Sequence, residues 1–194
     1  MTKIIGLTGG IGSGKTTIAE HIKSLGFPVY IADDEAKKIL KLPETLNSLK
    51  LVFGNSIFDD GLLNKDKLSN IVFNNPEMLK QLNQIIHPAV KSNFDLWLIA
   101  NRNYPLVVKE AAILFESGSY KDCDIVITII APLVSRIKRV VERDDVNSEA
   151  VLSRINNQWT DEMRILKSDY VIENKDIIKA CAQTEKILKK ILNQ

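Results

Sequence analysis

The amino-acid sequence predicts an α/β fold: a parallel five-stranded sheet flanked by helices, with an inserted helical subdomain and a lid. Short apolar runs alternate with longer amphipathic stretches, which is the order expected of parallel strands joined by crossover helices. The length of 194 residues suits one core domain, and a hydrophobic content of 45% is enough to bury a sizeable core.

Five apolar runs have the length and composition of buried strands. Between the second and the third lie roughly seventy residues of helical character without a convincing strand, which is too long for one crossover. We therefore predict an inserted helical subdomain over residues 43–102. It ends in a helix over about 76–100, which Pro88 should kink or break. The predicted strands are residues 3–7, 27–31, 106–109, 124–130 and 169–172.

A second insertion is predicted after the fourth strand. The stretch around residues 144–147 is polar and charged, and Ser148 with Glu149 indicates that a new helix starts there. We interpret residues 143–167 as a mobile lid. The predicted core then consists of residues 1–42, 103–142 and 168–194.

Charge and composition limit the expected partners and location. The 26 Lys and Arg residues nearly balance 24 Asp and Glu, so no general basic field predicts binding to nucleic acid or to a membrane. The most apolar later stretch, residues 125–134, is too short to cross a bilayer. We therefore expect a cytoplasmic protein in which Cys123 and Cys181 are reduced thiols.

A glycine-rich stretch follows the first apolar run. Gly9, four further residues, Gly14, Lys15 and Thr16 match the phosphate-binding pattern G-x-x-x-x-G-K-[ST]. The stretch lies between a predicted strand and a helix over 17–25, whose Ile18, Ile22 and Leu25 share one face; this is the context that the motif requires. The alternative is a glycine turn that only joins a strand to a helix.

This motif predicts a site for ATP with Mg²⁺. Glycines let successive backbone N–H groups point at phosphate oxygens, and the helix N-terminus adds its partial positive charge. Lys15 would hold the β- and γ-phosphates, and the Thr16 hydroxyl would be a ligand of Mg²⁺. The candidate ATP-binding residues are Gly10, Ile11, Gly12, Ser13, Gly14, Lys15, Thr16 and Thr17.

Other motifs favour a kinase over other proteins with this loop. A GTPase would carry N-K-x-D, but residues 64–67 and 174–177 both lack the final Asp. A motor ATPase usually ends a strand in Asp-Glu, whereas here the strand runs into Lys109 and Glu110. Glu110 could lie near the metal or be a solvated charge at the strand end.

Two carboxylates follow the second predicted strand. Asp33 and Asp34 lie where the carboxyl ends of parallel strands meet a ligand. Either could accept the proton of an attacking hydroxyl group or hold that group in place. Either could instead be the N-cap of the helix that follows.

Several cationic residues are weaker candidates. Arg136, Arg139 and Arg143 share one helical face, and their periodicity alone favours a solvated charged surface. An arginine at the entrance of a lid can neutralise charge on a transferring phosphoryl group, so we select Arg143, with Arg154 as a weaker candidate. His21 is expected at the surface. Trp97, Trp159 and His87, beside Pro88, are expected to be structural on position alone.

These residues together resemble the dephospho-coenzyme A kinases, over nearly the whole chain. The likeness is carried by GLTGGIGSGKTT, IADDEAKK, QLNQIIHPAV, EAAILFESG, RVVERDDVNSEAVLSRINNQ and SDYVIENK. It implies a nucleoside-kinase-like fold, a helical subdomain that binds the acceptor, and a lid. It also implies transfer of the ATP γ-phosphate to the ribose 3′-hydroxyl of dephospho-coenzyme A.

The resemblance also implies roles for particular residues. The family's base matches Asp33, its lid arginine matches Arg143, and its H-P pair matches His87 and Pro88, which makes His87 a candidate acceptor-binding residue. Two positions depart from the family pattern: Ile31 replaces the first Asp of D-A-D, and Ala112 replaces a common Pro. A kinase for a nucleoside monophosphate or another small metabolite is the alternative, and a nucleotide-dependent switch or binding module is a third reading.

Overall fold

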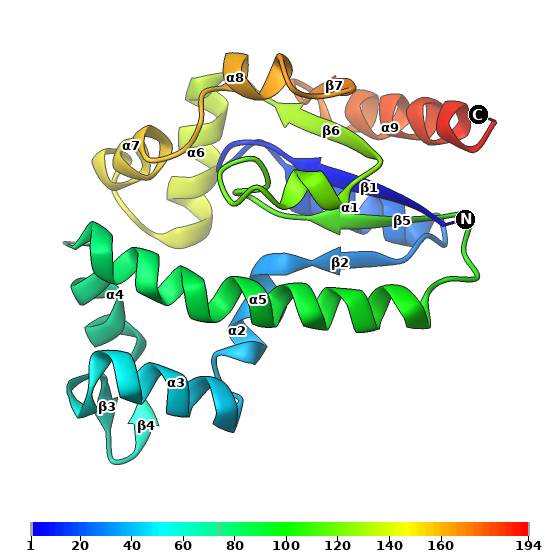
Figure 1. The fold of residues 1–194 in the computed structure, drawn as a ribbon. Coiled ribbons are helices and arrows are strands. Elements are labelled where there is room, and N and C mark those ends of the chain that lie inside the picture. Colours follow the sequence, from blue (N-terminus) through cyan, green and yellow to red (C-terminus); the bar gives the residue numbers. More distant parts are fainter. Residues whose placement is uncertain (1, 74, 194) are drawn as a thin grey trace. The chain divides into compact units, whose positions relative to one another are not determined.

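The structure, a computed structural model, describes residues 2–73 and 75–193 and divides into two compact units. The first unit comprises Met1–Ile31 and Ala100–Gln194, and the second comprises Ala32–Ile99 (Figure 1). Met1 and Gln194, the outermost residues of the predicted core, lie outside the described residues. The second unit begins before residue 43, where the subdomain was expected to start, because Leu40 already packs against its apolar core.

The first unit is built on the predicted parallel sheet of five strands, in the order β2-β5-β1-β6-β7. Every pairing between neighbouring strands is parallel. Glu110 pairs with Leu7 on one side and with Ile31 on the other, so three strands end at the same edge. The strands are β1 (Lys3–Thr8), β2 (Val29–Ile31), β5 (Leu106–Glu110), β6 (Ile125–Ile130) and β7 (Tyr170–Glu173).

Helices surround this sheet, and three of them begin at a side-chain cap. Asn147, Thr160 and Asp176 each accept a backbone N–H from the first turn of the helix that follows. The helix start predicted at Ser148 is confirmed. The helices are α1 (Lys15–Ser24), α6 (Leu133–Asp144), α7 (Ser148–Asn156), α8 (Asp161–Ile165) and α9 (Ile177–Leu192), with a short 3₁₀ helix η2 (Ser119–Asp122).

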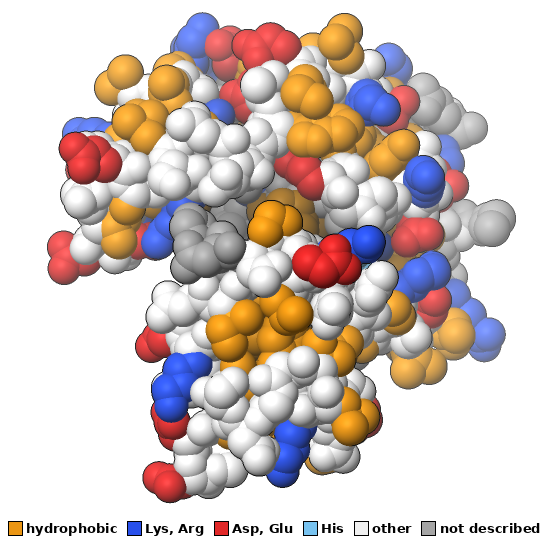
Figure 2. All heavy atoms as spheres, turned by 60° about the vertical axis from the view of Figure 1, so that its left-hand side comes forward, with side chains coloured by type: hydrophobic (Ala, Val, Ile, Leu, Met, Phe, Trp, Pro, Cys, Tyr) orange, Lys and Arg blue, Asp and Glu red, His pale blue; other side chains and the backbone are white. Residues whose placement is uncertain are grey.

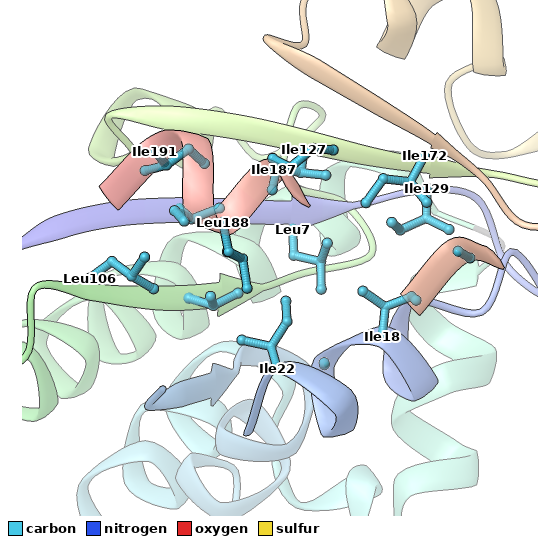
Figure 3. Close-up of a cluster of buried hydrophobic side chains, with 14 residues drawn as sticks. Leu7, Ile18, Ile22, Leu106, Ile127, Ile129, Ile172, Ile187, Leu188 and Ile191 are labelled. Atoms are coloured by element: carbon cyan, nitrogen blue, oxygen red, sulfur yellow. The ribbon is translucent and has the colours of Figure 1, made fainter. Parts of the chain in front are cut away.

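The main apolar core lies between one face of the sheet and helices α1 and α9 (Figure 3). Strand residues two apart in sequence, such as Ile127 and Ile129, point to this face because side chains alternate along a strand. Ile18 and Ile22 of α1 are fully buried here, as predicted. The burial of each side chain stabilises the folded state by about 1.5–3 kcal/mol. Leu25 was expected beside them but is 41% exposed, because α1 ends at Ser24 and Leu25 is its C-cap.

His21 is also less exposed than the sequence suggested. Its side chain is 23% exposed, and its Nε2 lies 3.1 Å from Oε1 of Glu185 on α9. This contact links α1 to α9 at the edge of the core. His21 therefore has a structural partner rather than a free surface position.

The second unit is mainly helical, as predicted, around a small apolar core of Leu49, Phe53, Ile57 and Leu68. It also contains a two-stranded antiparallel hairpin that the sequence analysis missed. Its turn is Asp60-Gly61, where both residues have positive φ, and Asp-Gly is a common signal for such a turn. The elements are α2 (Ala32–Ile39), α3 (Pro43–Phe53), η1 (Asn55–Ile57), β3 (Phe58–Asp59), β4 (Leu62–Leu63), α4 (Lys65–Phe73) and α5 (Pro76–Ala100).

Pro88 does not break α5, which runs without interruption from Pro76 to Ala100. A proline removes one backbone donor, but the remaining turns of a 25-residue helix keep their own hydrogen bonds. The expectation of a break was therefore wrong. Because the helix is continuous, His87 and the turn before it belong to the same helix.

Charged side chains of both signs are interspersed on the face shown in Figure 2, without a broad field of one sign. None of the helices within residues 2–73 and 75–193 combines the length and apolar character that a bilayer span requires.

Candidate active site

The loop between β1 and α1 has the backbone shape of a phosphate-binding loop. Gly9, Gly12 and Gly14 have φ values of 150°, 77° and 97°, which side-chain-bearing residues rarely adopt. The Ser13 N–H donates to the Gly10 carbonyl at 3.1 Å, which closes a tight turn. Gly14 is the N-cap of α1 and provides no side-chain cap, so the helix N-terminus presents its backbone donors to a ligand.

Three side chains hold the outer surface of this loop through its carbonyl groups. Arg136 Nε donates to the Ile11 carbonyl at 2.9 Å, and Asn174 Nδ2 donates to the Ser13 carbonyl at 2.8 Å. Arg139 donates to the carbonyl of Gly12, which lies between them, at 3.3 Å. With successive carbonyl oxygens bound on the outside, the loop can direct N–H groups to its inner side, as in other anion-binding nests.

The loop packs so closely on its supports that its glycines cannot carry side chains. A Cβ on Gly9 would lie 2.2 Å from the carbonyl oxygen of Ile129, and one on Gly12 would lie 2.5 Å from that of Arg136. The sequence predicted a solvated face for the arginines of α6, but Arg136 is only 5% exposed. That interpretation was wrong for Arg136, although Arg143 is indeed exposed. Periodicity identifies a polar face without showing what covers it.

Lys15 and Thr16 stand at the start of α1. Lys15 is 8% exposed, and its Nζ lies 3.4 Å from the Gly10 carbonyl, so the ammonium group curls over the loop. Thr16 is exposed in the first turn of the helix. No cluster of three or more His, Cys, Asp or Glu residues that could hold a metal occurs in the described part of the chain.

These donors fit a Mg²⁺ ion that arrives with a triphosphate, because Mg²⁺ is usually bound by few protein ligands together with substrate phosphates. Thr16 would supply one oxygen. Glu110 is the nearest carboxylate by strand register, opposite Leu7 at the end of β1. It is 3% exposed, so the alternative of a solvated strand-end charge is wrong.

A buried network of charges, which the sequence analysis missed, supports the loop from behind. Arg164 is fully buried and lies 3.0 Å from Glu116 and 3.5 Å from Asp161. Asp161 in turn lies 3.2 Å from Arg136, which binds the Ile11 carbonyl. Burial lowers the pKa of Arg164, and the neighbouring carboxylates oppose that effect. The two cations and two anions compensate each other in the interior.

The predicted lid arginines meet at one carboxylate. Arg143 donates to Asp144 at 2.7 Å and 3.1 Å, and Arg154 donates to the same group at 2.9 Å. The hydrogen bond from Arg143 is the main cause that holds the pKa of Asp144 below its usual range. The Arg143 side chain is 60% exposed, so it remains accessible to a ligand.

Asp33 and Asp34 belong to the second unit and lie in the first turn of α2. Because α2 begins at Ala32, neither aspartate is its N-cap. Negative charge in a first turn is favourable to the helix dipole, so both have a structural use as well. Asp34 pairs with Lys37 at 2.7 Å. Both aspartates are exposed, and Asp33 lies two residues beyond the end of β2.

The second unit also carries a hollow of about 460 Å³ along one face of α5. Burial lowers the pKa of His87, which lines this hollow and would therefore be neutral over more of the physiological range. The lining residues are Pro76, Leu79, Lys80, Asn83, Gln84, His87 and Pro88.

The two tryptophans have packing roles. Trp159 stacks on Phe115 with 5.5 Å between ring centroids, and Trp97 stacks on Phe94 at 5.9 Å. Cys123 and Cys181 are both free thiols, as predicted.

A parallel sheet whose first strand leads through this loop into a helix is the arrangement of P-loop proteins, a class that includes kinases. The same fold occurs in a shikimate kinase from Acinetobacter baumannii, which aligns with a TM-score of 0.53 at 17% identity and covers 100% of this chain and 94% of its own. A structure from Thermus thermophilus, TT1252, aligns at 0.88 with 33% identity over 99% of this chain and 97% of that one. A dephospho-CoA kinase from Campylobacter jejuni aligns at 0.73 with 28% identity over 100% and 98%.

Within that class, the chain belongs to the dephospho-CoA kinase family, whose model, CoaE, matches residues 3–180. A dephospho-CoA kinase from Fusobacterium nucleatum is 41% identical over 172 residues, which are 88% of this chain and 89% of the relative. One from Bacteroides fragilis is 37% identical over 171 residues, with coverages of 88% and 83%.

Proposed function

We propose that this protein transfers the γ-phosphate of ATP to the ribose 3′-hydroxyl of dephospho-coenzyme A, giving coenzyme A and ADP in the last step of coenzyme A biosynthesis. The observation that carries the proposal is the family match over residues 3–180, which includes the phosphate-binding loop and the whole second unit. ATP and dephospho-coenzyme A are the proposed partners.

The loop residues would bind the triphosphate. Lys15, whose Nζ lies 3.4 Å from the Gly10 carbonyl, would donate charge-assisted hydrogen bonds to phosphate oxygens. The Thr16 hydroxyl would be a ligand of Mg²⁺, which would supply positive charge against the charge that develops on the phosphates. Backbone N–H groups of residues 10–17 complete the proposed ATP site, apart from those of Ile11 and Ser13, which donate to Gln158 and to the Gly10 carbonyl.

Asp33 is the proposed base for the acceptor. Its carboxylate would accept the proton of the 3′-hydroxyl while that oxygen attacks the γ-phosphorus in line with the departing ADP. Asp33 is exposed and lies two residues after the end of β2. Asp34 is the weaker candidate because the family's base matches Asp33.

The helical second unit is the proposed acceptor-binding part. Its hollow on α5 offers an apolar floor of Pro76 and Leu79 beside donors and acceptors from Asn83 and Gln84. That mixture suits an acceptor with both a nucleotide and an amide-containing arm. We place His87 there as an acceptor-binding residue that is neutral and can both donate and accept.

Arg143 is the proposed lid residue. Its present pairing with Asp144 is largely solvated, and exposed ion pairs contribute at most about 1 kcal/mol. Arg143 could therefore leave Asp144 for a transferring phosphoryl group at little cost, while Arg154 continues to compensate Asp144. The cytoplasmic location, and the expectation that neither nucleic acid nor membrane is bound, stay predictions.

The decisive experiment is to incubate the protein with ATP, Mg²⁺ and dephospho-coenzyme A and to identify the product. Mass spectrometry should show one added phosphate, and ³¹P NMR should place it on the ribose 3′-oxygen. AMP, CMP and shikimate serve as parallel acceptors. Transfer to AMP in preference to dephospho-coenzyme A would contradict the proposed acceptor. Nucleotide-dependent partner binding without any phosphate transfer would indicate a switch.

A further inference from the structure

The peptide groups of Ile11 are bound on both sides by residues far away in the sequence. Its N–H donates to Oε1 of Gln158 at 2.9 Å, and its carbonyl accepts from Nε of Arg136 at 2.9 Å. A backbone N–H can only donate, so the Gln158 atom that faces it must be the amide oxygen. Ile11 is the one non-glycine residue between Gly9 and Ser13, at the tip of the phosphate-binding loop.

Gln158 begins a stretch, residues 158–164, that we call the return segment because there the chain comes back from α7 to the core. Trp159 donates its backbone N–H to Glu116 at 3.0 Å, and Thr160 caps α8. Asp161 lies 3.2 Å from Arg136, and the fully buried Arg164 lies 3.0 Å from Glu116. The return segment is therefore anchored at several points, although it falls within the lid predicted over 143–167.

We infer that Gln158 is a positioning residue for ATP binding, which holds the Ile11 peptide in the conformation that receives the triphosphate. The return segment acts on both peptide groups of Ile11: on its N–H directly through the Gln158 oxygen, and on its carbonyl through Asp161, which orients Arg136. The inference rests on the proposed function in one respect, namely that the ligand of the loop is a nucleoside triphosphate.

The physical reason is the conformational freedom of a glycine-rich loop. Such a backbone samples many states when nothing holds it, and the apparent affinity for a ligand falls with the fraction of molecules in the competent state. The bonds from α6 and Asn174 hold carbonyl groups, whereas Gln158 holds an N–H group. Losing Gln158 should therefore loosen the side of the loop that carries the phosphate-binding donors.

This arrangement also divides the predicted lid. Helix α7, which precedes Gln158, packs on α6. Its Arg154 shares Asp144 with the exposed Arg143. The return segment is tied to buried partners. Any closing movement would then be confined to the residues before Gln158, and the phosphate-binding loop would keep its support while the lid moves.

The test compares wild type with Gln158→Met, which keeps the length of the side chain but removes its acceptor. We expect the Kd for ATP, measured by isothermal titration calorimetry, to rise roughly threefold to tenfold, as for the loss of one hydrogen bond. The KM for dephospho-coenzyme A should stay unchanged, and the urea midpoint should fall no further than the loss of one hydrogen bond explains. Hydrogen exchange followed by NMR should be faster at the Ile11 amide and unchanged in the core strands.

Two further variants make the test specific. Gln158→Glu keeps an acceptor oxygen, so protection of the Ile11 amide should return. Gln183→Met is the matched control, because Gln183 on α9 makes one side-chain bond to the Val171 carbonyl at 3.0 Å, away from the loop; it should leave the ATP Kd unchanged. If Gln158→Met does not fold, Gln158→Asn removes the reach of the side chain and should give the same shift.

A Gln158→Met protein with the wild-type Kd and normal Ile11 exchange would overturn the inference. So would a weaker Kd that appears equally in Gln183→Met, or one that accompanies a general loss of stability. If the wild type itself bound no ATP, the proposed function would be wrong, and that result is visible before any variant is made.

Discussion

Replacing Gly12 with alanine tests the fit between the phosphate-binding loop and α6. Gly12 has a φ of 77°, and a Cβ added there would lie 2.5 Å from the carbonyl oxygen and 2.9 Å from the Cα of Arg136. These are backbone atoms of a helix and cannot turn aside. Gly26 is the matched control, because its φ is 91° but no atom lies within 4 Å of its added Cβ.

The two substitutions should differ by the cost of the clash. Left-handed backbone costs an alanine about 1–2 kcal/mol, and this cost applies to both Gly12→Ala and Gly26→Ala. Overpacking against an element that cannot move costs about 1–3 kcal/mol more, and it applies only to Gly12→Ala. We therefore expect the free energy of unfolding to fall by about 1–2 kcal/mol in Gly26→Ala and by about 2–5 kcal/mol in Gly12→Ala.

Urea denaturation measures the stability difference, and calorimetry with ATP measures its consequence for the site. If the loop relieves the clash by moving away from Arg136, it loses the bonds that hold its carbonyls, and the Kd for ATP should rise at least about tenfold. Gly26→Ala should bind ATP like wild type. The reasoning would be refuted if Gly12→Ala matched Gly26→Ala in both stability and ATP affinity.

Four further outcomes are expected. Lys15→Ala should weaken ATP binding at least about a hundredfold in calorimetry, since it removes a charge-assisted phosphate contact; an affinity equal to wild type would contradict the site. Asp33→Asn should bind ATP normally but transfer phosphate at least about a hundredfold more slowly, whereas Asp34→Asn should stay near wild type, and the reverse pattern would make Asp34 the base. Arg143→Ala should slow transfer about a hundredfold with an unchanged urea midpoint, and a normal rate would return this arginine to a purely surface role. Burial raises the pKa of Cys123 from 9.0 to about 12, so above pH 9 only the unfolded chain ionises and stability falls towards pH 12; urea titrations should show a smaller fall in Cys123→Ala, and an identical fall would exclude this thiol as a cause.

Local sequence patterns predicted much of the secondary structure of this protein. The five strands and the helix start at Ser148 were found from short stretches of sequence because alternation and capping depend on near neighbours. The Asp60-Gly61 turn was equally readable but was overlooked. The break expected at Pro88 was wrong because one residue's preference does not outweigh the hydrogen bonds of a long helix.

The supports of the loop could not be predicted in this way. Arg136 and Gln158 bind Ile11 from 125 and 147 residues away in the sequence. Arg164 lies in a polar stretch of the sequence, yet its side chain has no exposed surface. Helical periodicity separates polar from apolar faces but does not show which polar residue will be covered. A buried arginine is stable only where folding brings carboxylates to it.

The sequence by itself determined that β1 leads through a phosphate-binding loop into a helix, because spacing and glycine content set that geometry within a dozen or so residues. It also determined the family, because several motifs occur in a fixed order along the chain. Only the tertiary structure decided which residues hold the loop rigid and which stay exposed. Those contacts join distant segments, and their strength depends on burial, which arises only when the chain is folded.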